Sequence, residues 1–335
     1  MIILQQKNRN MKYEESIKAN TPYPVGSSGL LSYLMALRPR QWTKNLVVFA
    51  APLFAFSINI NSLAGSFLAF VLFCAASSSF YLINDIADVK SDRQHPVKCK
   101  RPIAAGLVKI PIATGMAFIL LSGALIISWL WSGSLGLTIL AYVILQTAYN
   151  ITLKRRVILD VIAIATGFVL RATAGGAATG IYISPWFLLC TAMLALFLAI
   201  EKRKAELRAI RLDVGKSRSV LKRYSLNLLS RMESVITANT IMTYALWSSG
   251  PQLKGASTPW MILSLPFVVY GVFRYQLLSD PKEIARRKKC NPDDGVHSER
   301  PEEVLLRDIP TLLTVLGWIL TVFIILFLKH EGVIQ

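Results

Sequence analysis

The chain has 335 residues, a formal net charge of +18 and a mean hydropathy of +0.48, and 53% of its residues are hydrophobic. Long apolar runs, rather than short alternating patterns, exclude an ordinary soluble domain and indicate membrane-spanning helices. The cysteines stand alone and only three histidines are present, which argues against a zinc site, a disulfide framework or a His-based triad. Because the basic residues lie between apolar runs, we expect them to set membrane topology and predict no nucleic-acid partner.

The first 30 residues are mostly polar, and their short apolar run is too brief for the core of a signal peptide. We expect a flexible cytoplasmic tail at 1–30, followed by one transmembrane domain at 31–335. Nine apolar stretches predict an all-α integral membrane protein with nine transmembrane helices. They cover 45–59, 64–83, 110–131, 133–149, 159–179, 186–200, 233–250, 260–278 and 309–328.

Lysine and arginine are concentrated in alternate connections between these stretches. Of the 37 basic residues, 33 lie in the segments 1–44, 84–109, 150–158, 201–232 and 279–308. Cytoplasmic loops carry such an excess, so we expect a cytoplasmic N-terminus and an outer C-terminus, in agreement with an odd number of helices. The sequence therefore predicts a multi-pass protein of the cell (inner) membrane, with its active site facing the cytoplasm.

An acidic cluster follows the second predicted span, in the stretch NDIADVKSDRQHPVKCKRPIAAG at 84–106. If the helix continues past residue 84, Asp85, Asp88 and Asp92 lie on one helical face. Carboxylates packed in this way need a cation, and Mg²⁺ is commonly held by carboxylates together with substrate phosphates. We predict a magnesium–diphosphate site on these three aspartates, with Asn84 orienting a ligand. The alternative is a solvated polar turn after the span.

Basic residues surround this cluster. Lys98 and Arg101 lie within ten residues of Asp92, the last of the aspartates, which favours phosphate binding. The stretch LRPRQWTKN, before the first span, either anchors the chain at the membrane interface or holds the phosphate of an anionic lipid. Its candidate residues are Arg38, Arg40, Gln41 and Lys44.

Further polar residues belong to the fifth predicted span and the connection before it. Tyr149, Lys154 and Asp160 face the same cytoplasmic layer, and Arg171 lies about 16 Å further along the helix axis. A mid-membrane arginine costs about 3 kcal/mol on insertion scales, so it must line a polar cavity or pair with an acid or with carbonyl groups.

These residues together resemble the UbiA superfamily of intramembrane prenyltransferases, whose first signature is NDxxDxxxD at the end of the second helix. In this sequence the signature is Asn84, Asp85, Asp88 and Asp92. Four other stretches are similar to the branch of the superfamily that transfers phosphoribose to decaprenyl phosphate: PRQWTKN (39–45), RATAGGAATG (171–180), KRKAEL (202–207) and PEEVLLRD (301–308). Where aromatic prenyltransferases carry a second acidic motif, this chain has KRKAE.

The resemblance implies transfer of 5-phosphoribosyl from phosphoribosyl diphosphate to a polyprenyl phosphate, with release of diphosphate. Mg²⁺ on the aspartates would neutralise the leaving group, and the anionic lipid phosphate would need no general base. Lys98, Arg101, Lys202 and Arg203 would hold the sugar phosphates, whereas Arg38, Arg40 and Lys44 would hold the lipid phosphate. Gln41, Tyr149, Lys154, Asp160 and Arg171 complete the candidate substrate-binding set.

Two other functions remain open at this point. One is a UbiA-type transfer of a prenyl group from prenyl diphosphate to an aromatic acceptor. The other is transport, which would spread ionisable residues across both leaflets, whereas here they crowd one side. The resemblance also permits a homo-oligomer.

Overall fold

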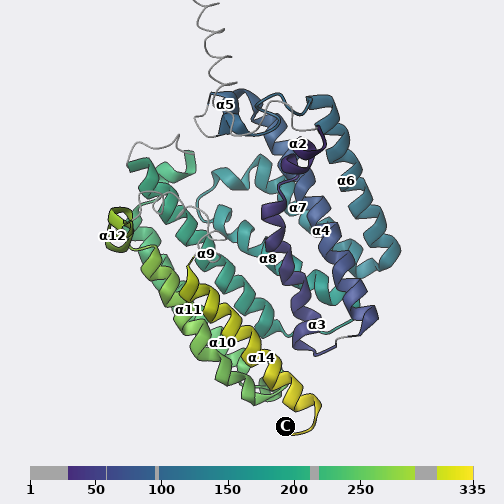
Figure 1. The fold of residues 1–335 in the computed structure, drawn as a ribbon, viewed down its shortest axis with the longest axis vertical. Coiled ribbons are helices and arrows are strands. Elements are labelled where there is room, and N and C mark those ends of the chain that lie inside the picture. The colour runs from purple at the N-terminus through teal and green to yellow at the C-terminus, as the bar shows by residue number, and fades with distance from the viewer. Residues whose placement is uncertain (1–28, 58, 95–97, 212–218, 291–307, 335) are drawn as a thin grey trace, which may run out of the picture. The chain divides into compact units, whose positions relative to one another are not determined.

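The computed structural model describes residues 29–57, 59–94, 98–211, 219–290 and 308–334, and its regular secondary structure in these ranges is helical (Figure 1). The predicted tail at 1–30 lies almost wholly outside the described residues, as does most of the PEEVLLRD stretch. The longer helices are α4 (Ile60–Ala87), α6 (Ile110–Trp131), α7 (Gly133–Ile151), α8 (Leu159–Thr179), α9 (Pro185–Arg211), α10 (Leu226–Ser248), α11 (Leu265–Leu278) and α14 (Ile309–His330).

Shorter helices connect or flank them. The short α-helices are α2 (Gly29–Ala36), α3 (Ala50–Phe54), α5 (Val89–Arg93) and α12 (Pro281–Cys290). The 3-10 helices are η1 (Pro39–Phe49), η2 (Lys98–Lys100), η3 (Leu153–Arg155), η4 (Ser219–Arg223), η5 (Pro251–Leu253) and η6 (Pro259–Ser264).

Seven helical segments in the described part of the chain are long and apolar enough to cross a membrane. They are Ile60–Ala87, Ile110–Trp131, Gly133–Ile151, Leu159–Thr179, Pro185–Arg208, Pro259–Leu278 and Ile309–His330. All seven coincide with predicted spans. The predicted span at 233–250 corresponds to α10, which is helical over 23 residues but contains many Ser, Thr and Asn side chains.

The predicted first span at 45–59 is not one long helix. The chain forms η1 up to Phe49 and then the five-residue α3, which is followed by Phe56 in the left-handed region at φ +49°. Pro52 has no backbone N–H to donate within α3, and the turn at Phe56 ends the helical path. The prediction of one continuous helix over 45–59 is wrong, because apolar character alone does not report these two interruptions.

The chain divides into two compact units, and two of the long helices contribute to both. The first unit comprises 1–41 and 75–122, and its core joins Ala36 of α2 and Leu82 of α4 to Ile103, Val108 and Ala113. These side chains are almost fully buried, so α2 and the 101–109 loop are held against the second half of α4.

The second unit comprises 42–74 and 123–335, and its helices α9, α10, α11 and α14 pack side by side (Figure 1). An aromatic cluster fills part of its core, where the Phe54 ring lies 4.8 Å from that of Trp247 and 5.1 Å from that of Phe187. Because Phe54 belongs to α3, these rings hold the short α3 segment in the helical core.

A close backbone approach joins η1 and α8 within the second unit. A Cβ atom on Gly175 would lie 2.0 Å from the carbonyl oxygen of Val48, so only glycine allows the two backbones to approach at this point. Small residues serve the same purpose at helix interfaces in membranes. This contact brings η1, and with it Asn45, beside the middle of α8.

Candidate functional site

The acidic face at the end of α4 is formed largely as predicted. The helix runs to Ala87, and the amides of Asp88 and Asp92 continue its hydrogen-bond pattern to the carbonyls of Asn84 and Asp88, at 2.9 and 2.8 Å. Asp85 and Asp92 are buried and accept from the same arginine, which places them on one face. Asp88 lies at the turn between α4 and α5, and it is exposed.

Arg38 reaches this face from the end of α2. Its backbone is left-handed, at φ +57°, where the chain turns between α2 and η1. The guanidinium lies 5.0 Å from the Tyr81 ring centroid, and its Nη2 donates to Oδ1 of Asp85 at 2.5 Å. Ser78 fixes the turn by donating to the carbonyl of Leu37 at 2.8 Å.

Arg101 reaches the same face from the loop after η2. Its Nη1 donates to Oδ1 of Asp85 at 2.9 Å and to Oδ2 of Asp92 at 2.7 Å. The loop is fixed by the buried Ile103 and by Arg93, whose Nε donates to the carbonyl of Ala104 at 3.2 Å. Two buried carboxylates thus meet two partly exposed guanidinium groups, an arrangement that provides ligands for both a cation and a phosphate.

The donor set fits a magnesium ion in part. Carboxylate oxygens are the ligands that Mg²⁺ prefers, and Arg101 already places a positive charge between Asp85 and Asp92. Within the described ranges, however, no three His, Cys, Asp or Glu side chains converge closely enough to hold one ion. The predicted set of three aspartates is therefore not assembled in this arrangement, because Arg101 lies between two of them while Asp88 faces outward.

Four other candidate residues belong to the same unit. Asn84, near the C-terminal end of α4, and Lys98, in η2, are both half-buried. In η1, Gln41 is half-buried and Arg40 is exposed. Their predicted roles in substrate binding remain predictions.

A second polar cluster, in the second unit, contains Asp160 and Arg203. Arg203 Nε donates to Asp160 Oδ2 at 2.8 Å and its Nη1 to Glu206 at 2.5 Å, and both Asp160 and Arg203 are fully buried. The third nitrogen, Nη2, has no hydrogen-bond partner among the described residues. Two carboxylates therefore enclose the guanidinium that the sequence had suggested for phosphate binding.

Tyr224 completes this cluster from the segment after η4. Its hydroxyl donates to Asp160 Oδ1 at 2.8 Å and accepts from the backbone N–H of Ile158 at 2.7 Å. Burial, together with this donation to the carboxylate, raises the pKa of Tyr224 to about 12, although the Ile158 N–H opposes the shift. Ile158 has φ +72°, a strained value for a β-branched residue, and the Tyr224 hydrogen bond helps to hold it there.

A neighbouring network surrounds Lys204, and sequence reasoning did not predict its connections. The Lys204 ammonium donates to Glu201 at 2.8 Å and forms an ion pair with Glu233 of α10. Gln276 of α11 donates to Glu233 at 2.9 Å and to Thr237 at 3.0 Å. Only the pair Glu201–Lys204 has a recognisable helical spacing, whereas the links between α9, α10 and α11 depend on tertiary packing.

Arg171 is buried and forms contacts of the structural kind. Its three nitrogens donate to Asn45 Oδ1 at 2.6 Å, to the Gly167 carbonyl at 2.7 Å and to the Tyr142 hydroxyl at 3.1 Å. Its guanidinium also lies 5.7 Å from the Phe73 ring centroid. Of the two alternatives for Arg171, these contacts favour a structural role, in which internal acceptors satisfy the guanidinium, over the lining of a cavity.

The remaining candidates are placed less distinctively. Tyr149 lies in the last turn of α7, Lys154 in η3, Lys202 in α9 and Lys44 in η1, and all four side chains are half-buried. Their substrate contacts remain predictions.

Membrane-length helices with charged side chains gathered at their ends define a multi-pass integral membrane protein. The model of the UbiA prenyltransferase family matches residues 45–291, and the chain belongs to this family. It is 36% identical to the decaprenyl-phosphate phosphoribosyltransferase of Mycolicibacterium smegmatis, over 88% of this chain and 91% of that protein. It is 35% identical to the Mycobacterium tuberculosis protein of the same name, over 86% of this chain and 91% of the relative.

Solved structures show the same fold. A UbiA homologue from Archaeoglobus fulgidus, bound to DMAPP and Mg²⁺, matches with a TM-score of 0.63 and 19% identity, over 87% of this chain and 98% of that one. A structure of digeranylgeranylglyceryl phosphate synthase matches with a TM-score of 0.60 and 16% identity, over 88% and 99% of the two chains. The chain is therefore an all-helical transferase of the UbiA family, as the sequence motifs indicated.

Proposed function

We propose that this protein transfers 5-phosphoribosyl from phosphoribosyl diphosphate to a polyprenyl phosphate of the decaprenyl type, and releases diphosphate. The observation that carries the proposal is the union of Asp85 and Asp92 with Arg38 and Arg101 at one helix end. The relatives of about 35% identity over most of the chain support the choice of substrates.

Mg²⁺ is the proposed cofactor, and Asp85, Asp88 and Asp92 are its proposed ligands. When bound, the ion would neutralise charge on the departing diphosphate. Asp88 is exposed and accessible to a hydrated ion, whereas Asp85 also holds Arg38 and Arg101 in place. A phosphate that enters with the ion would compete with these carboxylates for the guanidinium groups.

The chemistry needs cations more than it needs a base. The bond between C1 of ribose and the diphosphate oxygen breaks, and the electron pair leaves with diphosphate. A phosphate oxygen of the lipid, already anionic, forms the new bond to C1, so no proton is transferred. Arg38 and Arg101, which meet at Asp85, are the proposed N–H donors that would stabilise charge on the phosphates as the bond breaks.

We further propose nine crossings, made by the seven membrane-length helices, by α10, and by η1 and α3 together as a broken first crossing. The proposed orientation has a cytoplasmic N-terminus and an outer C-terminus, in the cell (inner) membrane. The strong bias of Lys and Arg toward alternate connections supports this orientation. It would put the acidic end of α4 on the cytoplasmic side, where the water-soluble sugar diphosphate is available.

The direct test is transfer of label from ribose-labelled phosphoribosyl diphosphate into the organic phase by purified full-length protein in detergent with Mg²⁺ and polyprenyl phosphate. We expect lipid-linked label from the wild type and a loss of at least about 100-fold in Asp92→Asn. Asp280→Asn is the matched control, because Asp280 is exposed before α12 and an asparagine can also cap that helix.

The contrary result is equally clear. Wild-type protein that makes no ribose lipid, yet prenylates an aromatic acceptor from a prenyl diphosphate, would keep the family and discard the proposed substrates. Equal loss in Asp92→Asn and Asp280→Asn would remove the argument for this site.

A further inference from the structure

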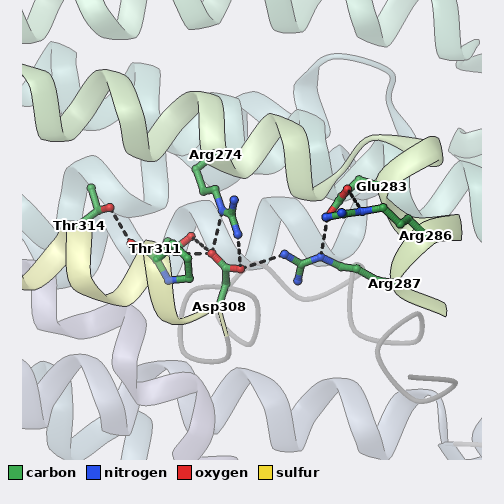
Figure 2. A network of polar contacts seen from close by, with 8 residues as sticks. Arg274, Glu283, Arg286, Arg287, Asp308, Thr311 and Thr314 are labelled. Carbon is green, nitrogen blue, oxygen red and sulfur yellow. Dashed lines mark hydrogen bonds and ion pairs between the residues drawn. The ribbon is translucent and has the colours of Figure 1, made fainter. Parts of the chain in front are cut away.

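Helix α12 is fixed to the start of α14 by a group of residues that we call the Asp308 clamp: Arg274, Glu283, Arg287, Asp308 and Thr311. Figure 2 shows Arg274 and Arg287 approaching Asp308 from two sides, with Glu283 beyond Arg287. Arg274 donates to both Asp308 oxygens, at 3.0 and 2.9 Å, and Arg287 donates to Oδ1 at 3.0 Å.

Asp308 also caps α14, because Oδ2 accepts from the backbone and the hydroxyl of Thr311 at 3.1 and 2.7 Å. Burial opposes ionisation of Asp308, but the hydrogen bonds from Arg274, Thr311 and Arg287 outweigh it and lower its pKa. Hydrogen bonds from Arg286 and Arg287 likewise lower the pKa of Glu283 to about 2. Both acids are therefore ionised at neutral pH and engaged with arginines.

The clamp leaves the other side of α12 strongly basic. The helix, PKEIARRKKC, contains five basic residues and one acidic residue, Glu283, which is already paired. Lys282 and Lys289 are exposed, and the Arg286 side chain is 75% exposed despite its pair with Glu283. Basic helices of this kind attract anionic lipid headgroups when they lie at a membrane surface.

An apolar groove of about 540 Å³ lies on α11, which directly precedes α12. It is lined by Leu265, Pro266, Val269, Tyr270, Phe273, Arg274 and Leu277. Leu277 lies in the last turn of α11 and Arg274 one turn before it, so the groove approaches α12 at its polar end. The 14 residues of α11 extend about 21 Å, which exceeds the roughly 15 Å of hydrocarbon in one leaflet.

We propose that α11 and α12 together form a binding site for an anionic phospholipid of the bilayer. One acyl chain lies in the α11 groove and the phosphate meets the exposed basic side of α12, at Lys282, Arg286 and Lys289. Charge complementarity selects an anionic headgroup, and the continuity between the groove and α12 selects a lipid over a free anion.

Native mass spectrometry of the full-length protein in detergent can test this, using phosphatidylglycerol and phosphatidylcholine with identical acyl chains. We expect preferential binding of phosphatidylglycerol by the wild type. The double variant Lys282→Gln/Lys289→Gln should bind it about fivefold more weakly for each lysine removed. The matched control is Lys222→Gln/Arg223→Gln, which removes two exposed cations from η4 in the same unit and should keep the preference.

A groove-filling variant, Val269→Trp, tests the apolar half and should weaken binding of both lipids equally. Four outcomes would overturn the proposal. The first three are equal binding of the two lipids by the wild type, equal loss of phosphatidylglycerol binding in the α12 and η4 variants, and unchanged lipid binding in Val269→Trp. The fourth is displacement of phosphatidylglycerol by an equimolar polyprenyl phosphate, which would make this a substrate-entry surface. Because the substituted lysines are exposed, a thermal melt can verify that the α12 variant remains folded.

Discussion

A single nitrogen of Arg101, Nη1, joins Asp85 and Asp92 at 2.9 and 2.7 Å. The two carboxylates are seven residues apart and on one face, as the spacing of the motif predicted. This contact gives the motif a structural role beside its proposed ligand binding, because it holds the 101–109 loop on α4. The three aspartates should therefore respond differently to substitution.

Asp85→Asn should lower both activity and thermal stability, since Asp85 is buried and accepts from Arg38 and Arg101. Asp88→Asn should lower activity with little change in stability, because Asp88 is exposed. Transfer assays and thermal melts of the two variants, made side by side, provide the comparison. Equal destabilisation by both substitutions would contradict the distinction.

Asp308→Asn should destabilise the protein by about 1–3 kcal/mol at neutral pH, because the amide keeps a cap acceptor but loses the charge that holds Arg274 and Arg287. The folded pKa of Asp308 is lowered, so its stabilising effect is full above the usual value of 3.8 and disappears only as the pH falls through the lower folded value. The difference in unfolding free energy between the wild type and Asp308→Asn should thus persist at mildly acidic pH.

Chemical denaturation across a pH series would measure this gap. Asp280→Asn serves as the control, because Asp280 is exposed and caps α12 without contacting an arginine in the clamp. A gap that closes at or above the ordinary aspartate pKa would be inconsistent with the lowered value.

Tyr224→Phe should lower the free energy of unfolding by about 1–2 kcal/mol, because it removes the donor to Asp160 and the acceptor for the Ile158 N–H. The pKa of Tyr224 is raised to about 12 from 10.0, so its contribution is full below about pH 10 and is lost as the pH rises toward 12. The destabilisation should therefore shrink in that window. Tyr182→Phe, at a 75% exposed tyrosine, should show neither effect.

Gly175→Ala should destabilise the protein by about 3 kcal/mol or prevent its folding, because the new methyl group would overlap the Val48 carbonyl. Gly123→Ala is the control: a Cβ there meets nothing within 4 Å, and alanine should stabilise α6 by about 0.5–1 kcal/mol. Thermal melts in detergent would separate the two. A neutral Gly175→Ala would mean that η1 and α8 are not closely packed.

Much of the architecture could be predicted because membrane helices are recognisable in a sequence by their length and apolar composition. The acidic face of α4 was predictable as well, since the positions of Asp85 and Asp92 follow from helical periodicity alone. The short η1 and α3 were not, because two local interruptions, Pro52 and the left-handed Phe56, override a continuous apolar pattern.

The partners of the charged residues could not be predicted either. Arg203 has the sequence context of a phosphate ligand, yet it is enclosed by Asp160 and Glu206. Glu206 lies three residues away on the same helix, but the pairing with Asp160 is decided by helix packing between α8 and α9, and no local spacing reports it. The same holds for Lys204 and Glu233, which are distant in sequence.

The environment of Arg171 bears on how the chain enters the membrane. Its partners Asn45, Gly167 and Tyr142, and the nearby Phe73 ring, all precede it in the sequence. Synthesis runs from the N-terminus, so every one of these groups has been made before Arg171 leaves the ribosome. The charged side chain of Arg171 can therefore form its hydrogen bonds as α8 inserts, without first being exposed to the hydrocarbon core unpaired.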